Sequence, residues 1–137
     1  MKKAAGSVAS VALVGMLMMA SGAHAEGNYG CACVHNRTNN QVNYSYRWGE
    51  ADWRKIALNA NYTMAHCWRY ENGQHSSPNL QISLDIDLGP ETTMKTYDLP
   101  RGQAVNNVCN AEISNNFWFD ISYVQGSGEH FIHVTHR

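Results

Sequence analysis

Apolar and polar residues alternate along most of the chain after residue 25, and this period of two predicts half-buried β-strands. The clearest row is 80–88, where Leu and Ile occupy every second position and polar residues the others. Segments 42–48 and 117–123 alternate in the same way. Weaker strand patterns occur at 31–34, 53–58, 64–70, 94–99, 105–111 and 131–135.

Turn-forming residues separate these segments, for example Asn72-Gly73, Gly89-Pro90 and Gly126-Ser127-Gly128. No segment sustains a helical period, and no internal repeat or interdomain linker is visible. Short strands at regular spacing indicate an antiparallel sandwich. We therefore expect an all-β fold: a single small antiparallel β-sandwich of jelly-roll or immunoglobulin-like type, with about seven to nine strands.

The first 25 residues have the three parts of a secretory signal. Lys2 and Lys3 begin it, an apolar run follows over 8–20, and Ala23-His24-Ala25 provides a small-x-small cleavage site. A membrane anchor is the alternative, but roughly a dozen apolar residues are too few to span a bilayer. The expected organisation is a signal peptide over 1–25 and one β-sandwich domain over 26–137, in a secreted or periplasmic protein, as in bacteria.

Charge narrows the range of partners. The chain has 10 Lys+Arg and 11 Asp+Glu, so removing Lys2 and Lys3 with the signal leaves 8 against 11, a net charge near −3. Such a balance lacks the basic footprint of a nucleic-acid-binding protein. No later segment is long and apolar enough for integral membrane insertion. The expected partner is a protein, a glycan or the cell envelope, and no cofactor is predicted.

Four cysteines remain after the signal: Cys31, Cys33, Cys67 and Cys109. In an oxidising compartment an even number predicts disulfides, here two. Cys31 and Cys33 lie roughly 6.6 Å apart on one face of an extended strand, which disfavours a bond between them. We expect Cys33 to pair with Cys109 and Cys31 with Cys67, with the crossed arrangement as the alternative.

Histidine and cysteine offer a metal site as the alternative function. A periplasmic copper- or zinc-binding protein could use the cysteines or His35, His66, His130, His133 and His136. Strand parity argues against convergence near the C-terminus, because His133 would face away from His130 and His136. The simpler interpretation is a set of exposed histidines on a closing strand, and no metal ligand is predicted.

No catalytic motif is recognisable in the sequence. Gly126-Ser127-Gly128 has the composition of a turn, and no phosphate-binding glycine loop is present. Asp85 and Asp87 share a strand face, but the other face is entirely Leu and Ile, so the two carboxylates are predicted to be its solvated side. A non-enzymatic protein is therefore expected, with a small secreted hydrolase as a further alternative.

The candidate binding residues are aromatic and basic: Trp53, Trp68, Arg69, Tyr70 and Trp118. Exposed aromatic rings form stacking surfaces for sugar rings or partner side chains. A second buried apolar layer is the alternative for the same rings. Charged residues make up only 15% of the chain, which favours stacking and hydrogen bonding over electrostatic capture. The sequence thus predicts a binding protein that acts through an aromatic-rich surface, in which alanine at Trp118 weakens binding and leaves the fold intact.

Overall fold

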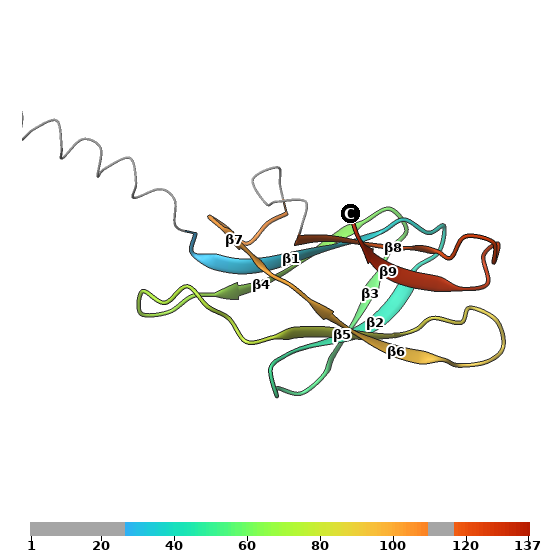
Figure 1. Cartoon of the computed structure of the whole chain (residues 1–137), viewed down its shortest axis with the longest axis horizontal. Coiled ribbons are helices and arrows are strands. Elements are labelled where there is room, and N and C mark those ends of the chain that lie inside the picture. The colour runs from blue at the N-terminus through green and yellow to red at the C-terminus, as the bar shows by residue number, and fades with distance from the viewer. Residues whose placement is uncertain (1–26, 110–116) are drawn as a thin grey trace, which may run out of the picture.

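Two β-sheets form the part of the chain described by the computed structural model, residues 27–109 and 117–137 (Figure 1). The strands in this part are β1 (Tyr29–Asn36), β2 (Val42–Trp48), β3 (Arg54–Leu58), β4 (Thr63–Arg69), β5 (Leu80–Asp85), β6 (Met94–Leu99), β7 (Gly102–Ala104), β8 (Trp118–Tyr123) and β9 (Ile132–His136). These residues contain no helix long and apolar enough to cross a membrane. The predicted all-β, two-sheet class is confirmed, whereas the predicted signal segment lies outside the described residues.

One sheet has the strand order β4-β1-β8-β9, with β7 also pairing with β1, and the other has the order β3-β2-β5-β6. Strand β4 runs along one edge of β1, so β7 and β8 share the opposite edge. The pairing of β1 with β8 is parallel, which corrects the expectation of a wholly antiparallel sandwich. The two strands are far apart in the chain, so no hairpin dictates their relative direction.

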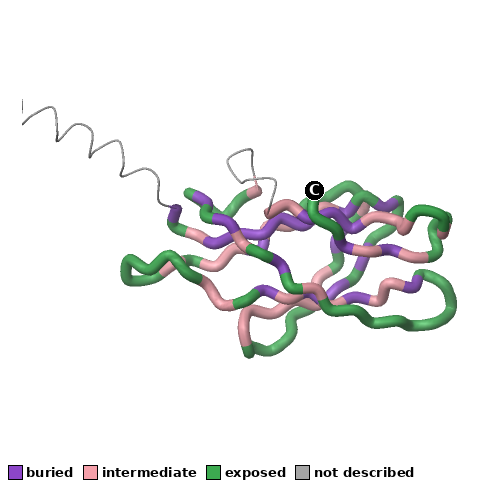
Figure 2. Tube along the Cα trace, viewed as in Figure 1, coloured by how far each residue is buried: buried purple, intermediate pink, exposed green. Residues whose placement is uncertain are grey.

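The core lies between the two sheets and takes buried residues from both. Buried and less buried residues alternate along strands such as β5 (Figure 2). Leu80, Ile82 and Leu84 of β5 are at most 1% exposed. The predicted row over 80–88 ends early, because β5 stops at Asp85 and Leu88 is 41% exposed. The alternation continues in the sequence past the point where the chain leaves the sheet.

The predicted strand over 105–111 is also wrong as far as residue 109, and residues 110–111 lie outside the described part. The strand here is β7, only three residues long, and Val105 and Val108 after it are about half exposed. Gly102 begins β7, and the ring of Phe117 lies where its Cβ would be. The position of β7 is determined by its pairing with β1 and by this close ring contact. The hydrophobic alternation of the residues that follow therefore does not indicate a strand.

Both predicted disulfides are present, with the expected pairing. Cys31 and Cys67 are register partners on β1 and β4, with Cα atoms 4.1 Å apart. The second bond joins Cys33 to Cys109 across 5.9 Å between Cα atoms. The cysteines lie on the outer face of their sheet, where Ala104 and neighbouring aromatic rings form a second, smaller core.

Candidate functional site

The sandwich opens toward one end, where the inner faces of β2 and β4 carry aromatic side chains. On β2, Tyr44 is 3% exposed, whereas Trp48, four residues on, is only partly buried. On β4, His66 is 3% exposed and Trp68 is again partly buried. The rings of Trp48 and Trp68 pack 5.5 Å apart between their centroids, one from each sheet. A pair of indoles thus lines the mouth of the core.

Strand β3 shows the same gradient with a charged residue at its end. Leu58 is buried, Ile56 is half-buried, and Arg54 on the same face is exposed. Arg54 is the register partner of Tyr46 on β2, so it lies beside the aromatic row. An arginine at an inward-facing position is tolerated here because the two sheets no longer cover it.

A cleft of about 320 Å³ occupies this mouth. It is lined by Tyr46, Arg47, Trp48, Ala51, Asp52, Arg54, Cys67 and Trp68. Its walls come from the end of β2, the turn before β3, the start of β3 and the end of β4. This volume and mixed lining lie within the range of small-molecule sites in proteins.

Arg47 is held in place from two sides. Its Nε–H donates to Oε1 of Gln81 at 3.0 Å, and the Nε2–H of Gln81 donates to Asp98 at 2.9 Å. The guanidinium group also lies over the ring of Trp53, 4.7 Å from its centroid. Such stacking and hydrogen bonding reduce the conformational freedom of the side chain before any ligand arrives.

The cleft is cationic within a chain of net charge −1. Two arginines, Arg47 and Arg54, and one aspartate, Asp52, line it; Arg47 has the opposite parity to Trp48 in β2, and its Nε is held by Gln81. Within residues 27–109 and 117–137, neither Arg54 nor Asp52 forms an ion pair. The terminal nitrogens of Arg47 likewise make no hydrogen bond to the described part of the chain. These groups are therefore available to bind a ligand.

A second hollow of about 410 Å³ adjoins the first at Trp68. It is lined by Trp68, Glu71, Gln74, Ser76, Ser77 and Pro78, most of them from the loop after β4. Amide, hydroxyl and carboxylate groups predominate here, in contrast to the arginines of the first cleft. The indole of Trp68 thus borders two hollows of different chemistry.

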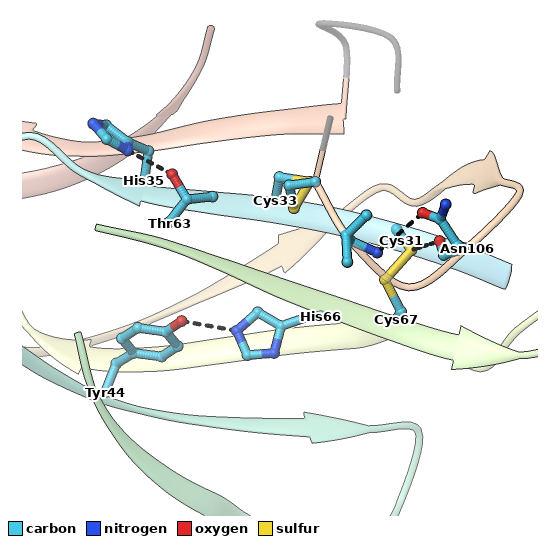
Figure 3. The surroundings of a disulfide bond; sticks show 10 residues. Cys31, Cys33, His35, Tyr44, Thr63, His66, Cys67 and Asn106 are labelled. Atoms are coloured by element: carbon cyan, nitrogen blue, oxygen red, sulfur yellow. Dashed lines mark hydrogen bonds between the residues drawn. A yellow bond between two sulfur atoms is a disulfide. The ribbon is translucent and has the colours of Figure 1, made fainter. Parts of the chain in front are cut away.

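Behind the aromatic mouth lies a buried polar pair. The hydroxyl of Tyr44 is 2.8 Å from Nε2 of His66 (Figure 3). The ring of Tyr46 packs 4.5 Å from the imidazole, between ring centroids. Burial lowers the pKa of His66 to about 4, so the imidazole is neutral at physiological pH. Burial also raises the pKa of Tyr44, with a smaller contribution from Tyr46. Tyr44 and His66 thus form a neutral, hydrogen-bonded pair in the core next to the cleft.

The predicted binding residues are distributed over two faces. Trp68 lines the cleft, and Trp53 contacts it through Arg47. Arg69 lies over the ring of Tyr29, and Tyr70 packs against His75; neither Arg69 nor Tyr70 lines the cleft. Arg69 has the opposite parity to Trp68, and Tyr70 follows the end of β4.

Trp118 occupies the opposite face of its sheet from Trp68. It is the register partner of Cys33 and packs against the disulfide cluster. The guanidinium of Arg137 covers its ring at 4.6 Å from the centroid. The structure therefore separates Trp118 from the cleft.

Sequence reasoning missed Trp48, Arg47 and Arg54. A signal was available: Trp48 ends the alternating row of β2, and Arg54 continues the parity of Ile56 and Leu58. Polar or very large residues at the ends of inward-facing rows mark the place where a sandwich opens.

The histidines of the alternative metal site are dispersed. His35 Nδ1 lies 2.7 Å from the hydroxyl of Thr63, His66 is in the core, and His136 packs on Phe119. His133 is the register partner of Ser122. In the described residues no three His, Cys, Asp or Glu side chains come together as metal ligands, and every described cysteine is in a disulfide.

Asp87 corrects the expectation of a solvated acidic face. It is 8% exposed, and its Oδ1 lies 2.8 Å from Nε2 of His130, whose side chain is half exposed. Asp85 accepts the backbone N–H groups of Asp87 and Thr93. The two carboxylates organise the turn after β5, because the backbone there has left the sheet and needs acceptors.

Asp120 is a second buried carboxylate, on the outer face beside Trp118. Oδ2 lies 3.0 Å from Arg37 Nε, and Oδ1 lies 2.8 Å from Arg137 Nη2. Burial would raise the pKa of Asp120, but the hydrogen bonds from Arg137 and Arg37 outweigh it and hold the pKa below its usual value. Burial and the same two arginines lower the pKa of His35.

Comparison of the chain with protein-family models, curated proteins and solved structures finds no match. The functional proposal therefore depends on the geometry and chemistry of the cleft.

Proposed function

We propose that the protein is a non-catalytic binding protein whose cleft between β2 and β4 takes a sugar ring of a glycan. The observation that carries this proposal is the pair of indoles, Trp48 and Trp68, at the mouth of the sandwich. An aromatic face offers apolar contact to the C–H groups of a sugar ring, while the polar groups around it bind hydroxyls.

The composition of the cleft supports binding over catalysis. Asp52 is the one carboxylate among the described residues that line it, and Glu71 lies across the Trp68 indole, in the adjoining hollow. Hydrolysis of a glycosidic bond ordinarily employs two carboxylates on either side of the bond. Retention of a ring by stacking needs no such pair.

We propose that the protein works outside the cytoplasm, secreted or in the periplasm. Two disulfides fit an oxidising compartment, and the sequence of residues 1–25 fits a secretory signal. Mass spectrometry of the protein recovered from culture medium and periplasm tests this. A mass beginning at Glu26 supports export, and an intact Met1 in the cytoplasm contradicts it.

For the fold we keep the jelly-roll or immunoglobulin-like arrangement as a proposal within the two-sheet class. Nine short strands in two sheets support it. An experimental structure that places the strands in another order would overturn it.

The binding proposal is tested by screening a glycan array, followed by calorimetric titration of the best saccharide. Trp48→Ala and Trp68→Ala should each weaken binding about tenfold or more, the effect of removing a central aromatic contact. Trp118→Ala is the matched control, because its indole lies on the opposite face of the sheet. Its binding should equal that of the unmodified protein.

Each variant is first checked by near-UV circular dichroism for native packing. Binding that survives both cleft substitutions, or is lost with Trp118→Ala in a folded protein, contradicts this site. A protein partner captured in place of any glycan would contradict the ligand class.

A further inference from the structure

We propose that the cleft and the adjoining hollow are two subsites for an acidic oligosaccharide: a uronic-acid unit lies in the cleft, and a neutral unit lies across Trp68. This inference rests on the proposed glycan-binding function and specifies its ligand. It is carried by the contrast between the two hollows that share the Trp68 indole.

The carboxylate preference follows from the arginines. Arg47 is fixed by Gln81 and by stacking on Trp53, so its terminal N–H groups have a defined direction. Arg54 lines the same cleft and forms no ion pair within the described residues. Guanidinium groups bind carboxylates through charge-assisted hydrogen bonds, stronger than those made to hydroxyls.

Asp52 limits how much negative charge the cleft accepts. Two guanidinium groups and one carboxylate leave a single positive charge among the lining residues. One carboxylate per bound unit matches this balance, whereas a unit with a second anionic group, such as a sulfated uronic acid, would face repulsion from Asp52. The carboxylate of Asp52 can accept a hydrogen bond from a sugar hydroxyl.

The second subsite is assigned from the residues that line the hollow on the other side of Trp68. Gln74, Ser76 and Ser77 offer amide and hydroxyl groups, and Glu71 adds a carboxylate. No arginine or lysine lines this hollow within the described residues, and Arg101, which contacts Ser77, is engaged by the hydroxyl and carbonyl oxygens of that residue. Its chemistry therefore favours the hydroxyls of a neutral sugar and disfavours a second acidic unit.

Three saccharides test the inference by calorimetric titration. The first is an aldobiouronic acid, glucuronic acid linked to one neutral hexose; the second is its methyl ester; the third is glucuronic acid alone. We expect the disaccharide to bind about tenfold more tightly than its ester, because the ester cannot form the charged hydrogen bonds. It should exceed glucuronic acid alone by a similar factor, because the monosaccharide leaves the second subsite empty.

Substitutions assign each preference to its subsite. Arg54→Gln and Arg47→Gln should bring the acid-to-ester ratio close to one while retaining ester binding. Lys55→Gln is the matched control, since it removes the same charge from the next residue of β3, which has the opposite parity. Gln74→Ala should reduce the advantage of disaccharide over monosaccharide, and Gln125→Ala in an exposed turn should not.

The outcomes separate the inference from the proposed function. Equal binding of acid and ester that still requires Trp68 overturns the carboxylate subsite and leaves glycan binding standing. Equal binding of disaccharide and monosaccharide overturns the second subsite. If none of the three probes binds but other saccharides bind at Trp68, the further inference is wrong and the proposed glycan binding stands. If no saccharide binds, the proposed function is wrong as well. Nuclear magnetic resonance signals of the four indole N–H groups locate the contact in each case.

Discussion

Tyr44 and His66 meet inside the sandwich, one from each sheet, with the phenol oxygen 2.8 Å from Nε2 of the imidazole. Each residue is 3% exposed. Since burial lowers the pKa of His66 to about 4, folding excludes a proton that the unfolded chain binds below about pH 6.5. The core therefore contains a titratable group that links stability to acidity.

The free energy of unfolding should be independent of His66 above pH 6.5 and fall as the pH decreases toward 4. Lowering the pKa from 6.5 to about 4 corresponds to a loss of about 3 kcal/mol, complete below pH 4. Urea unfolding at a series of pH values measures it. His66→Gln should flatten the decline, and His133→Gln should retain it because His66 is intact. A decline unchanged in His66→Gln would refute this origin.

Removing the hydroxyl of Tyr44 should destabilise the protein. In Tyr44→Phe the buried imidazole loses its hydrogen-bond partner, which costs about 1–3 kcal/mol. Tyr62→Phe is the control, because Tyr62 is 63% exposed. Both are measured by urea unfolding at pH 7. Equal stabilities of the two variants would mean that the buried bond contributes nothing.

The disulfides should dominate the stability of so small a domain. They close chain segments with sequence separations of 36 and 76 residues, and each contributes about 4 kcal/mol in the chain-entropy treatment. The double variants Cys31→Ser with Cys67→Ser, and Cys33→Ser with Cys109→Ser, should each lower the urea midpoint strongly. A midpoint within error of the unmodified protein for either double variant would contradict the expectation.

The same variants test the pairing. Only Ala32 separates Cys31 from Cys33, so proteolytic fragments of the unmodified protein keep the two cysteines together. In the Cys33→Ser, Cys109→Ser variant, a remaining bond from Cys31 to Cys67 lowers the mass by about 2 Da relative to the reduced form. Two reactive thiols in that variant would support the crossed pairing.

Asp120→Asn should destabilise the protein by about 1–3 kcal/mol, because the amide cannot replace two charged hydrogen bonds to Arg37 and Arg137. The lowered pKa of Asp120 means that its contribution is present above pH 4 and is lost as the pH falls further. Thermal unfolding at pH 7 and pH 3 measures both effects. Glu91→Gln, at an exposed turn, serves as the control and should change neither.

Local patterns predicted the features that depend on strand parity. The spacing of Cys31 and Cys33 placed both on one face and disfavoured a bond between them, which left two pairings open, and the preferred one is observed. The alternation at 42–48 likewise predicted β2 to the residue. Parity is a local property of an extended chain, so the sequence contains it directly.

Properties that depend on distant segments could not be predicted in this way. The burial of Asp120 requires Arg37 and Arg137, and the burial of Asp87 depends on His130 in another loop. Likewise, the cleft forms where the two sheets diverge, and the sequence pattern of a single strand does not indicate where this happens. The parity of Trp118 is opposite to that of the inward row of its strand, but only the three-dimensional arrangement shows that Trp68 lines the cleft and that Trp118 packs on the disulfide cluster.

The position of β1 bears on the order in which the molecule can be assembled. Its edge opposite β4 is completed by β7 and β8, so the first strand of the described chain must wait for segments made near the end. Synthesis proceeds from the N-terminus, and contacts between distant segments form slowly. The sheet therefore cannot close on a nascent chain until β8 has emerged. Up to that moment β1 can pair along its β4 edge and, once β7 is made, along only a short part of the opposite edge.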